Sequence, residues 1–445
     1  MTTTDLIIIG AGPGGYRAAE YAAKQGLKVV IFEDSDVGGT CLNVGCIPTK
    51  TYVHSATFEE ARERMGQVVT QLRAGVEGIL SHPNITLVRE KASFENHGDC
   101  PRDSSAAEIM GTVPVILTAS GETYTAPNII IATGSETKWL PLPGKDDPRV
   151  VDSTGLLQLD TLPKRLCIIG AGVIGMEFAS VFNRFGSEVM VIEYLKECLP
   201  VLDSDIAKRL RKLLEKRGIT FKMKTAVENI ADIDADVILM ATGRKPRTEG
   251  LNLEALGVTL VPNGAIPVDD DFRVTSLTSH HSPHTSIYAI GDVNGKQMLA
   301  HAAEMQAIHA VNHILGKKDN IRFDIMPAAI FTEPEAACVG PTEDQLKEQG
   351  TPYICKKSFW RANGKTLAMN ETEGMLKLFV SPPESERVPE GRGGLILGCH
   401  AYGAHSADII QEVSVLMCKH TTLGELADMV HIHPTLSEIL KNAVD

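Results

Sequence analysis

A glycine-rich pattern occurs twice in this chain, 160 positions apart, and it restricts both copies to one kind of supersecondary unit. In each copy a short apolar strand runs into a GxGxxG turn, a helical pattern and a second apolar strand. An acidic residue follows 18 positions after the third glycine, Glu33 in the first copy and Glu193 in the second. The turn glycines are Gly10, Gly12 and Gly15 in the first copy and Gly170, Gly172 and Gly175 in the second. This context is typical of a dinucleotide-binding βαβ unit.

Each residue type in such a unit has a physical reason. The first glycine makes the tight turn, the second lets the backbone approach a pyrophosphate, and the third lets the helix pack on the strand. The helix N-terminus then presents the positive end of its dipole to the phosphates. We expect Glu33 and Glu193 to accept hydrogen bonds from ribose hydroxyls. The alternative for either copy is a glycine turn that binds no ligand.

Length, charge and cysteine content exclude several classes of protein. The 445 residues suffice for roughly three domains. A net charge of −13 disfavours a general binder of nucleic acid or of anionic membranes. The chain lacks an apolar run of about 18 residues, and its start resembles neither a secretory nor a transit peptide, so we expect a cytoplasmic protein. Nine scattered cysteines do not form the paired framework of a small secreted domain.

Other apolar runs indicate how the sheets are completed. Ile129–Ile131 ends in Ala-Thr-Gly, and the same ending follows Val237–Met240. Ser286–Ile290 is a further strand, and from about residue 325 strand-like segments are followed by helical ones. The pattern predicts an α/β protein with two Rossmann-like (three-layer ββα/βα) dinucleotide-binding domains and a C-terminal α+β domain.

Two cysteines follow the first glycine motif closely. Pro48 suits the first turn of a helix, so Cys46 is expected beside a helix N-terminus, where a thiolate is stabilised. Cys41 lies five positions earlier, and the pair could meet disulfide geometry. The alternatives are zinc binding, for which we find no further ligands at comparable spacing, and two unpaired thiols in a loop. The His280–His284 run is interpreted as a solvated loop, so no metal is expected.

The segment from Gly38 to Lys50, GGTCLNVGCIPTK, resembles the redox-active segment of the flavin-dependent pyridine nucleotide-disulfide oxidoreductases. The resemblance covers essentially the whole chain. The C-terminal segment HIHPTLSE, 431–438, narrows it to the dihydrolipoamide dehydrogenases. The resemblance implies FAD and NAD as cofactors, and a homodimer in which the C-terminal domain serves dimerisation.

The resemblance also implies roles for individual residues. Cys41 is the outer thiol that exchanges with substrate, and Cys46 is the inner thiol that contacts the flavin. His433 is the acid/base, oriented by Glu438 and contributed by the other subunit, and Lys50 lies near the flavin, paired with Glu177. The first glycine motif with Glu33 binds the ADP part of FAD, Asp292 its ribityl or pyrophosphate region, and the second motif with Glu193 binds NAD. Further cofactor contacts are expected at Thr40, Lys50, Thr133, Gly134, Gly243, Gly291 and Ala300.

Several of these residues have simpler explanations. Thr435 and Glu438 also fit a capping box, in which Glu438 returns to the Thr435 amide. His433 precedes a proline, so it also fits an ordinary extended loop. Lys50 and Glu177, taken singly, are more often solvated charges.

The expected domains follow the same resemblance. They are an FAD-binding domain over 1–148 with a small antiparallel insert at about 84–128, an NAD-binding domain over 149–270, a segment over 271–325 that completes the FAD domain, and an interface domain over 326–445. The loops 92–112 and 274–286 are longer than the family leads us to expect.

The expected reaction is oxidation of dihydrolipoyl groups, with electrons passing through the cysteine pair and FAD to NAD. Glu193 repels a 2′-phosphate, and nearby Lys196 is the compensating charge in the sequence, so NAD is favoured over NADP. The substrate is expected on a lipoyl domain of a separate 2-oxoacid dehydrogenase or glycine-cleavage chain. The alternatives are another disulfide or mercuric reductase of this fold, and a non-catalytic FAD- and NAD-binding redox sensor.

Overall fold

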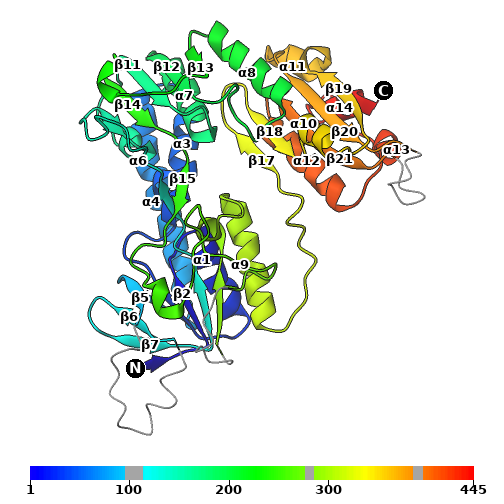
Figure 1. Ribbon diagram of the computed structural model, residues 1–445. Coiled ribbons are helices and arrows are strands. Elements are labelled where there is room, and N and C mark those ends of the chain that lie inside the picture. Colours follow the sequence, from blue (N-terminus) through cyan, green and yellow to red (C-terminus); the bar gives the residue numbers. More distant parts are fainter. Residues whose placement is uncertain (96–113, 276–284, 384–393, 445) are drawn as a thin grey trace. The chain divides into compact units, whose positions relative to one another are not determined.

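The computed structural model describes residues 1–95, 114–275, 285–383 and 394–444 (Figure 1). These residues form two compact units, which are described separately. Unit 1 comprises Met1–Thr51, Glu59–Lys138 and Arg244–Ile321, and unit 2 comprises Tyr52–Phe58, Trp139–Gly243 and Arg322–Asp445. Each unit therefore collects segments that are far apart in the sequence. None of the helices within the described ranges has the length and apolar content needed to span a bilayer.

Unit 1 is built on a five-stranded sheet in which every neighbouring pair is parallel. The strands, in sheet order, are β16 (Ser286–Ala289), β8 (Asn128–Ile131), β2 (Leu6–Ile9), β3 (Val29–Phe32) and β4 (Ile85–Val88). All four residues of β2 and of β3 are buried, as expected for central strands of a covered parallel sheet. Helix α1 (Pro13–Lys24) packs on β2 and β3 and against α9 (Ala300–Ile314).

One prediction for this sheet was wrong. Ile85–Val88 was expected in the antiparallel insert, but it pairs in parallel with β3 as an edge strand of the main sheet. Its alternation arises because an edge strand is only partly covered: Ile85 is buried and Thr86 is exposed. Alternation alone does not distinguish these two environments.

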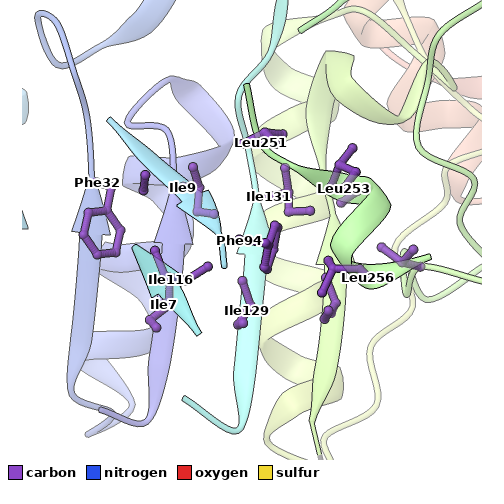
Figure 2. Close-up of a cluster of buried hydrophobic side chains, with 14 of the residues drawn as sticks. Ile7, Ile9, Phe32, Phe94, Ile116, Ile129, Ile131, Leu251, Leu253 and Leu256 are labelled. Atoms are coloured by element: carbon purple, nitrogen blue, oxygen red, sulfur yellow. The ribbon is translucent and has the colours of Figure 1, made fainter. Parts of the chain in front are cut away.

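The insert is a second, smaller sheet that covers one face of the parallel sheet. It comprises β1 (Thr2–Thr3), β7 (Thr123–Thr125), β6 (Ile116–Thr118) and β5 (Ala92–Phe94). Figure 2 shows Phe94 and Ile116 of the insert among Ile9, Ile129 and Ile131 of the parallel sheet, in one buried cluster. Unit 1 thus has the expected layers of small sheet, parallel sheet and helices. A short antiparallel pair, β9 (Ser135–Thr137) with β15 (Arg244–Pro246), completes the unit together with α4 (Phe58–Leu80).

Unit 2 contains a second five-stranded parallel sheet with a related strand order. In sheet order its strands are β10 (Val150–Val151), β14 (Val237–Met240), β11 (Arg165–Ile169), β12 (Glu188–Glu193) and β13 (Thr220–Met223). Helix α7 (Val173–Phe185) packs on β11 and β12, as α1 does on β2 and β3. The shared arrangement of first strand, helix and second strand explains the sequence repeat. The helices α6 (Ser153–Leu157) and α8 (Ser204–Lys216) complete this part.

The remainder of unit 2 is an antiparallel sheet with helices, which confirms the predicted α+β C-terminal domain. Its strands in order are β17 (Ala328–Ile330), β18 (Ala336–Val339), β21 (Ile396–Tyr402), β20 (Met375–Val380) and β19 (Ile354–Phe359). The helices are α10 (Glu343–Glu348), α11 (Gly364–Met369), α12 (Ser406–Cys418), α13 (Leu423–Asp428) and α14 (Glu438–Val444). The predicted fold class is therefore confirmed, while the exact domain boundaries stay predictions.

A buried polar network joins α8 to this antiparallel sheet within unit 2. Lys377 and Asp203 have side chains that are each 1% exposed, and Lys377 Nζ lies 2.6 Å from both Asp203 Oδ1 and Glu343 Oε2. His400, fully buried, accepts a hydrogen bond from the Asp203 amide through Nδ1 at 3.0 Å. Its Nε2 lies 3.1 Å from the Pro341 carbonyl oxygen. Burial lowers the pKa of His400 to about 4, so the neutral imidazole is the form that the fold stabilises.

This shift predicts an acid-dependent loss of stability. Because the pKa of His400 in the folded protein is about 4 and in an unfolded chain about 6.5, its contribution is present above pH 6.5 and is lost as the pH falls toward 4. Linkage gives about 2 kcal/mol lost by pH 5. Urea unfolding of the wild type and of His400→Gln at pH 7 and pH 5 measures this loss. Between the two pH values, the free energy of unfolding of the variant should fall by about 2 kcal/mol less than that of the wild type.

The control is His420→Asn, because His420 is exposed and its positive φ of 55° is tolerated by asparagine. This control should lose as much stability as the wild type. Glu343, whose pKa is lowered to about 2 by its hydrogen bond to Lys377, titrates below this pH window. An equal loss in His400→Gln and in the wild type would contradict the account of His400.

Candidate active site

Both glycine turns pass very close to a neighbouring strand end. Gly10 has φ 102°, and a Cβ there would lie 2.5 Å from the Ala132 carbonyl oxygen. Gly170 has φ 106°, and a Cβ there would lie 2.4 Å from the Ala241 carbonyl oxygen. A side chain is excluded at both positions by conformation and by space. The two turns are therefore equivalent in three dimensions.

The third and second glycines of each motif differ in their surroundings. A Cβ at Gly15 would lie 1.8 Å from the Gly10 carbonyl oxygen, and one at Gly175 would lie 2.0 Å from that of Gly170, so helix and turn are in direct contact. A Cβ at Gly12 would meet only the Gly39 Cα atom, at 3.8 Å, and one at Gly172 would meet nothing within 4 Å. The second glycine thus faces the space that a pyrophosphate needs, and both turns fit a dinucleotide.

The two acids at the ends of the second strands fold back over these turns. Glu33 Oε2 accepts a hydrogen bond from the Ala11 amide at 2.8 Å. Glu193 Oε2 accepts one from the Ala171 amide at 2.6 Å, and its Oε1 accepts one from the Leu195 amide at 2.7 Å. Each carboxylate is therefore fixed above its turn, and a carboxylate has further lone pairs to accept ribose hydroxyls.

Cys41 and Cys46 lie close together in unit 1. Cys41 is in α2 (Gly39–Val44) and Cys46 is the first residue of α3 (Cys46–Val53). The predicted helix start beside Cys46 is therefore confirmed. A hydrogen bond to Cys46, burial, and the charge of the second sulfur together raise the pKa of the Cys41 thiol. Reduction of the pair thus favours at most one thiolate, which places the negative charge away from Cys41.

Charged and phenolic groups of unit 1 surround Cys41. The positive charge of Lys50 lowers the pKa of Cys41, whereas the carboxylate of Glu304 raises it. Tyr16 on α1 donates a hydrogen bond to Glu304 Oε1 on α9 at 3.5 Å. Burial, with the charges of Glu304 and Cys41, raises the pKa of Tyr16 to about 12. The position of Tyr16 in this group was not predicted, because α1 and α9 are far apart in the chain.

The predicted FAD-binding residues after β8 and β16 form a second group in unit 1. Asp292 Oδ2 accepts a hydrogen bond from Ser135 Oγ at 2.5 Å. Arg244 donates to the same Ser135 oxygen at 2.7 Å. The Gly291 amide donates to Gln306 Oε1 at 2.8 Å. Ser135 and Arg244 were not predicted as parts of this site because both are far from Asp292 in the sequence. Gln306 was not predicted because its contact with Gly291 carries no sequence motif.

The remaining predicted residues are placed as follows. Thr133 donates to the Arg247 carbonyl oxygen at 2.7 Å, and Gly134 next to it has φ 73°. Thr40 is in α2, Ala300 is the first residue of α9, and Gly243 has φ 105° at the end of the second parallel sheet. Their contacts with a cofactor stay predictions.

His433 and Glu438 form a hydrogen-bonded pair in unit 2. His433 Nδ1 lies 3.0 Å from Glu438 Oε1, and the His433 side chain is 78% exposed. The Thr435 amide donates to Glu438 Oε2 at 3.0 Å, as the capping-box interpretation predicted. The Thr435 amide and His433 lower the pKa of Glu438. One carboxylate therefore binds both the Thr435 amide and the imidazole, whereas the Thr435 hydroxyl donates to the Ile432 carbonyl oxygen and does not complete a capping box.

Lys50 and Glu177 belong to different units, so their pairing stays a prediction. Within unit 2, Glu177 is 4% exposed on α7 and its Oε1 accepts a hydrogen bond from the Phe331 amide at 2.9 Å. Glu177 is therefore a buried carboxylate and not a solvated surface charge. The His280–His284 run, Cys100 and most of the loops 92–112 and 274–286 lie outside the described residues.

Comparisons with known proteins agree over the length of the chain. The family model described as Pyridine nucleotide-disulphide oxidoreductase matches residues 4–307, and its dimerisation domain matches 326–444. Dihydrolipoyl dehydrogenase 3 of Pseudomonas putida is 36% identical over 100% of this chain and 98% of its own length. Leghemoglobin reductase of Glycine max is 35% identical over 99% of this chain and 86% of its own length. The solved HOCl-induced flavoprotein disulfide reductase RclA from Escherichia coli has a TM-score of 0.86 and 31% identity, covering 99% of both chains.

The contact between the first and third glycines predicts a defect on Gly15→Ala. The new Cβ would lie 1.8 Å from the Gly10 carbonyl oxygen, so helix or turn must move. Overpacking of this kind costs about 1–3 kcal/mol, and a loss of this size on the FAD-bound state corresponds to about fivefold to 150-fold weaker FAD binding. The FAD retained per chain after dialysis measures the effect. The control is Gly66→Ala in α4, where a Cβ meets nothing within 4 Å; equal retention in both variants would contradict the prediction.

Proposed function

Because the chain belongs to the pyridine nucleotide-disulfide oxidoreductase family, whose members contain FAD and use NAD(P), we propose that it is a dihydrolipoyl dehydrogenase. The substrate is a dihydrolipoyl dithiol, and the products are the lipoyl disulfide, NADH and a proton. The single observation that supports this most directly is the Cys41–Cys46 pair, whose sulfurs are in hydrogen-bond contact. Neighbouring sulfurs of this kind can be joined and separated without large movements of the backbone.

Thiol–disulfide exchange at this pair explains the different roles of the two cysteines. A thiolate of the substrate attacks Cys41 Sγ in the disulfide, forms a mixed disulfide and releases Cys46 as a thiolate. The second substrate thiolate then attacks the substrate sulfur in the mixed disulfide, which releases the lipoyl disulfide and Cys41. Cys46 at the start of α3 is suited to hold the negative charge. The raised pKa of Cys41 favours its return to the thiol.

His433 is the proton carrier in this proposal. Glu438 holds its Nδ1 at 3.0 Å, which leaves Nε2 to accept the substrate proton and later to return one to Cys41. Imidazole is suited to this role because it can both accept and donate a proton near neutral pH. We assign His433 to the site of the other subunit of a homodimer, in line with the dimerisation-domain match over 326–444.

The glycine motifs of this chain hold the cofactors in the proposal. Gly10, Gly12 and Gly15 with Glu33 hold the ADP part of FAD, and the second motif with Glu193 holds NAD. When bound, FAD supplies the electron acceptor that reoxidises the dithiol and delivers hydride to the nicotinamide. Lys50 and Asp292 are assigned to the flavin side of the site. Glu177 is assigned as the carboxylate that pairs with Lys50.

The physiological partner in this proposal is a lipoyl domain carried by another chain, in the cytoplasm. A second candidate function is reduction of a different disulfide or oxidised acceptor. RclA has a similar fold and is 31% identical to this chain, and leghemoglobin reductase is 35% identical to it. The names of both proteins describe other activities. Steady-state turnover with dihydrolipoamide and NAD⁺, compared with NADH-dependent reduction of other disulfides, separates the two.

Replacing Cys46 with serine is expected to abolish dihydrolipoamide oxidation, because the inner sulfur that leaves in the first exchange is lost. The assay is NADH formation from dihydrolipoamide by the FAD-loaded variant. Cys418→Ser is the matched control, since Cys418 is exposed at the end of α12, and it should keep wild-type turnover. Normal turnover of Cys46→Ser would refute the mechanism.

The position of Glu193 predicts a preference for NAD⁺. Its carboxylate is held above the second turn and would repel a 2′-phosphate. Two lysines supply positive charge near Glu193. Lys196 follows it in the sequence, and the exposed Lys224 lies close by because its amide donates to the Leu195 carbonyl oxygen at 3.0 Å. The proposal predicts a higher kcat/KM with NAD⁺ than with NADP⁺, and Glu193→Gln should narrow the difference. A higher kcat/KM with NADP⁺ in the wild type would overturn it.

A further inference from the structure

Asn43 lies between the two redox cysteines and is held by an unusually complete set of hydrogen bonds. Its Nδ2 atom donates to the carbonyl oxygens of Val37 and Gly39, each at 3.0 Å, and more weakly to that of Asp36 at 3.3 Å. These bonds join the body of α2 to the loop that precedes it. The side chain therefore closes α2 against its own approach segment.

The amide oxygen of Asn43 is bound from a different element. Arg73, near the middle of α4, donates to Asn43 Oδ1 from Nε at 3.1 Å and from Nη2 at 2.9 Å. Its third nitrogen, Nη1, lies 2.8 Å from Asp36 Oδ2. One guanidinium thus connects α4 to both ends of the loop–α2 segment, and we call Asp36, Asn43 and Arg73 the α2 clamp. All three residues belong to unit 1.

We propose that Arg73 is a positioning residue for the redox pair, and that the α2 clamp favours the Cys41–Cys46 disulfide over the dithiol. The inference rests on the proposed function, because it assumes that these two cysteines form a reversible disulfide. It adds a residue outside the sequence motif that carries the cysteines. Arg73 acts through Asn43 and touches neither sulfur in the contacts described.

The need for a clamp follows from the local structure. α2 has six residues, its N-cap Gly38 is left-handed, and Gly45 ends it with φ −136° and ψ −113°. So short a helix is not stable by itself, and glycine at both ends gives the chain additional freedom. Because a disulfide requires its Cα atoms within about 4.4–6.8 Å, loosening α2 lowers the effective concentration of one sulfur at the other. The clamp reduces the freedom of the dithiol and so stabilises the disulfide.

The geometry distinguishes this arrangement from an ordinary surface ion pair. Two of the three contacts of Arg73 go to the neutral Asn43, and only one goes to a carboxylate. An exposed ion pair alone is worth little. The planar fork of arginine can bind Asn43 and Asp36 together, whereas lysine, a point charge, cannot reproduce that arrangement.

The test is the redox equilibrium of the pair in FAD-loaded Arg73→Gln and wild type at one pH. Each protein is equilibrated anaerobically with oxidised and reduced dithiothreitol. The Cys41–Cys46 disulfide takes two electrons from the dithiol reagent and one proton for each pair that is reduced to a thiol and a thiolate, and the other proton goes to the buffer. The thiols are then alkylated and counted by mass spectrometry on the peptide that contains both cysteines. The equilibrium constant for reduction should rise by about threefold to tenfold in the variant, or about 14 to 30 mV for a two-electron couple.

Matched variants show whether the effect passes through Asn43. Arg73→Lys keeps the charge, and it should still shift the equilibrium by at least half as much on a logarithmic scale as Arg73→Gln. Asn43→Ala should shift it as Arg73→Gln does, and the double variant should not exceed the larger single effect. Arg89→Gln removes an exposed arginine of unit 1 that pairs with Glu77, and it should leave the equilibrium at the wild-type value.

The outcomes separate this inference from the proposed function. A wild-type protein in which Cys41 and Cys46 never form a disulfide would refute the proposed function. A wild-type pair that titrates normally, with Arg73→Gln within twofold of it, would refute the role of the clamp alone. A shift of the same size in Arg89→Gln would also refute it, because the effect would then come from lost charge. Unchanged far-UV circular dichroism and FAD content in Arg73→Gln establish that the comparison is made on folded protein.

Discussion

The contact between the sulfurs of Cys41 and Cys46 is the interaction on which the proposed redox chemistry depends. It brings together a residue within α2 and the first residue of α3. The N-terminus of α3 begins at Cys46, while α2 is tied by Asn43 to its own loop and by Arg73 to α4. The same contact raises the pKa of Cys41 and so assigns the single negative charge of the reduced pair to one side. The position of the two sulfurs and the location of the negative charge in the reduced pair therefore depend on the same few residues.

The two parallel sheets show how one local solution is used for two ligands. In both, the backbone carbonyl of a neighbouring strand end lies where the first glycine would carry a side chain, and the second glycine opens onto free space. In both, a glutamate closes over the turn through the amide after the first glycine. The two glycine turns differ in the segments that follow their βαβ units. The first turn is followed by the cysteine segment, and the second by exposed residues, Tyr194 to Lys196.

The features that could be predicted from the sequence are those fixed by local physics. The GxGxxG turns, the helix beginning at Cys46 and the hydrogen bond from the Thr435 amide to Glu438 each depend on residues that are close together in the sequence. Ile85–Val88 was misassigned because the alternation of an edge strand is the same in a parallel sheet and in an antiparallel insert. Ser135 beside Asp292, and Arg73 beside Asn43, were missed because each contact joins segments that only the tertiary fold brings together. The network of Lys377, Asp203 and His400 is of the same kind.

The central claim is that this cysteine pair stores two electrons in addition to those of the bound flavin. Anaerobic titration of the purified FAD-loaded protein with dithionite, followed by its visible spectrum, tests the claim most directly. The account predicts that full reduction consumes two electrons for the flavin and two more for the disulfide, since a disulfide is a two-electron couple. Consumption of the flavin's two electrons alone, with both thiols already present before the titration in air-oxidised protein, would contradict it.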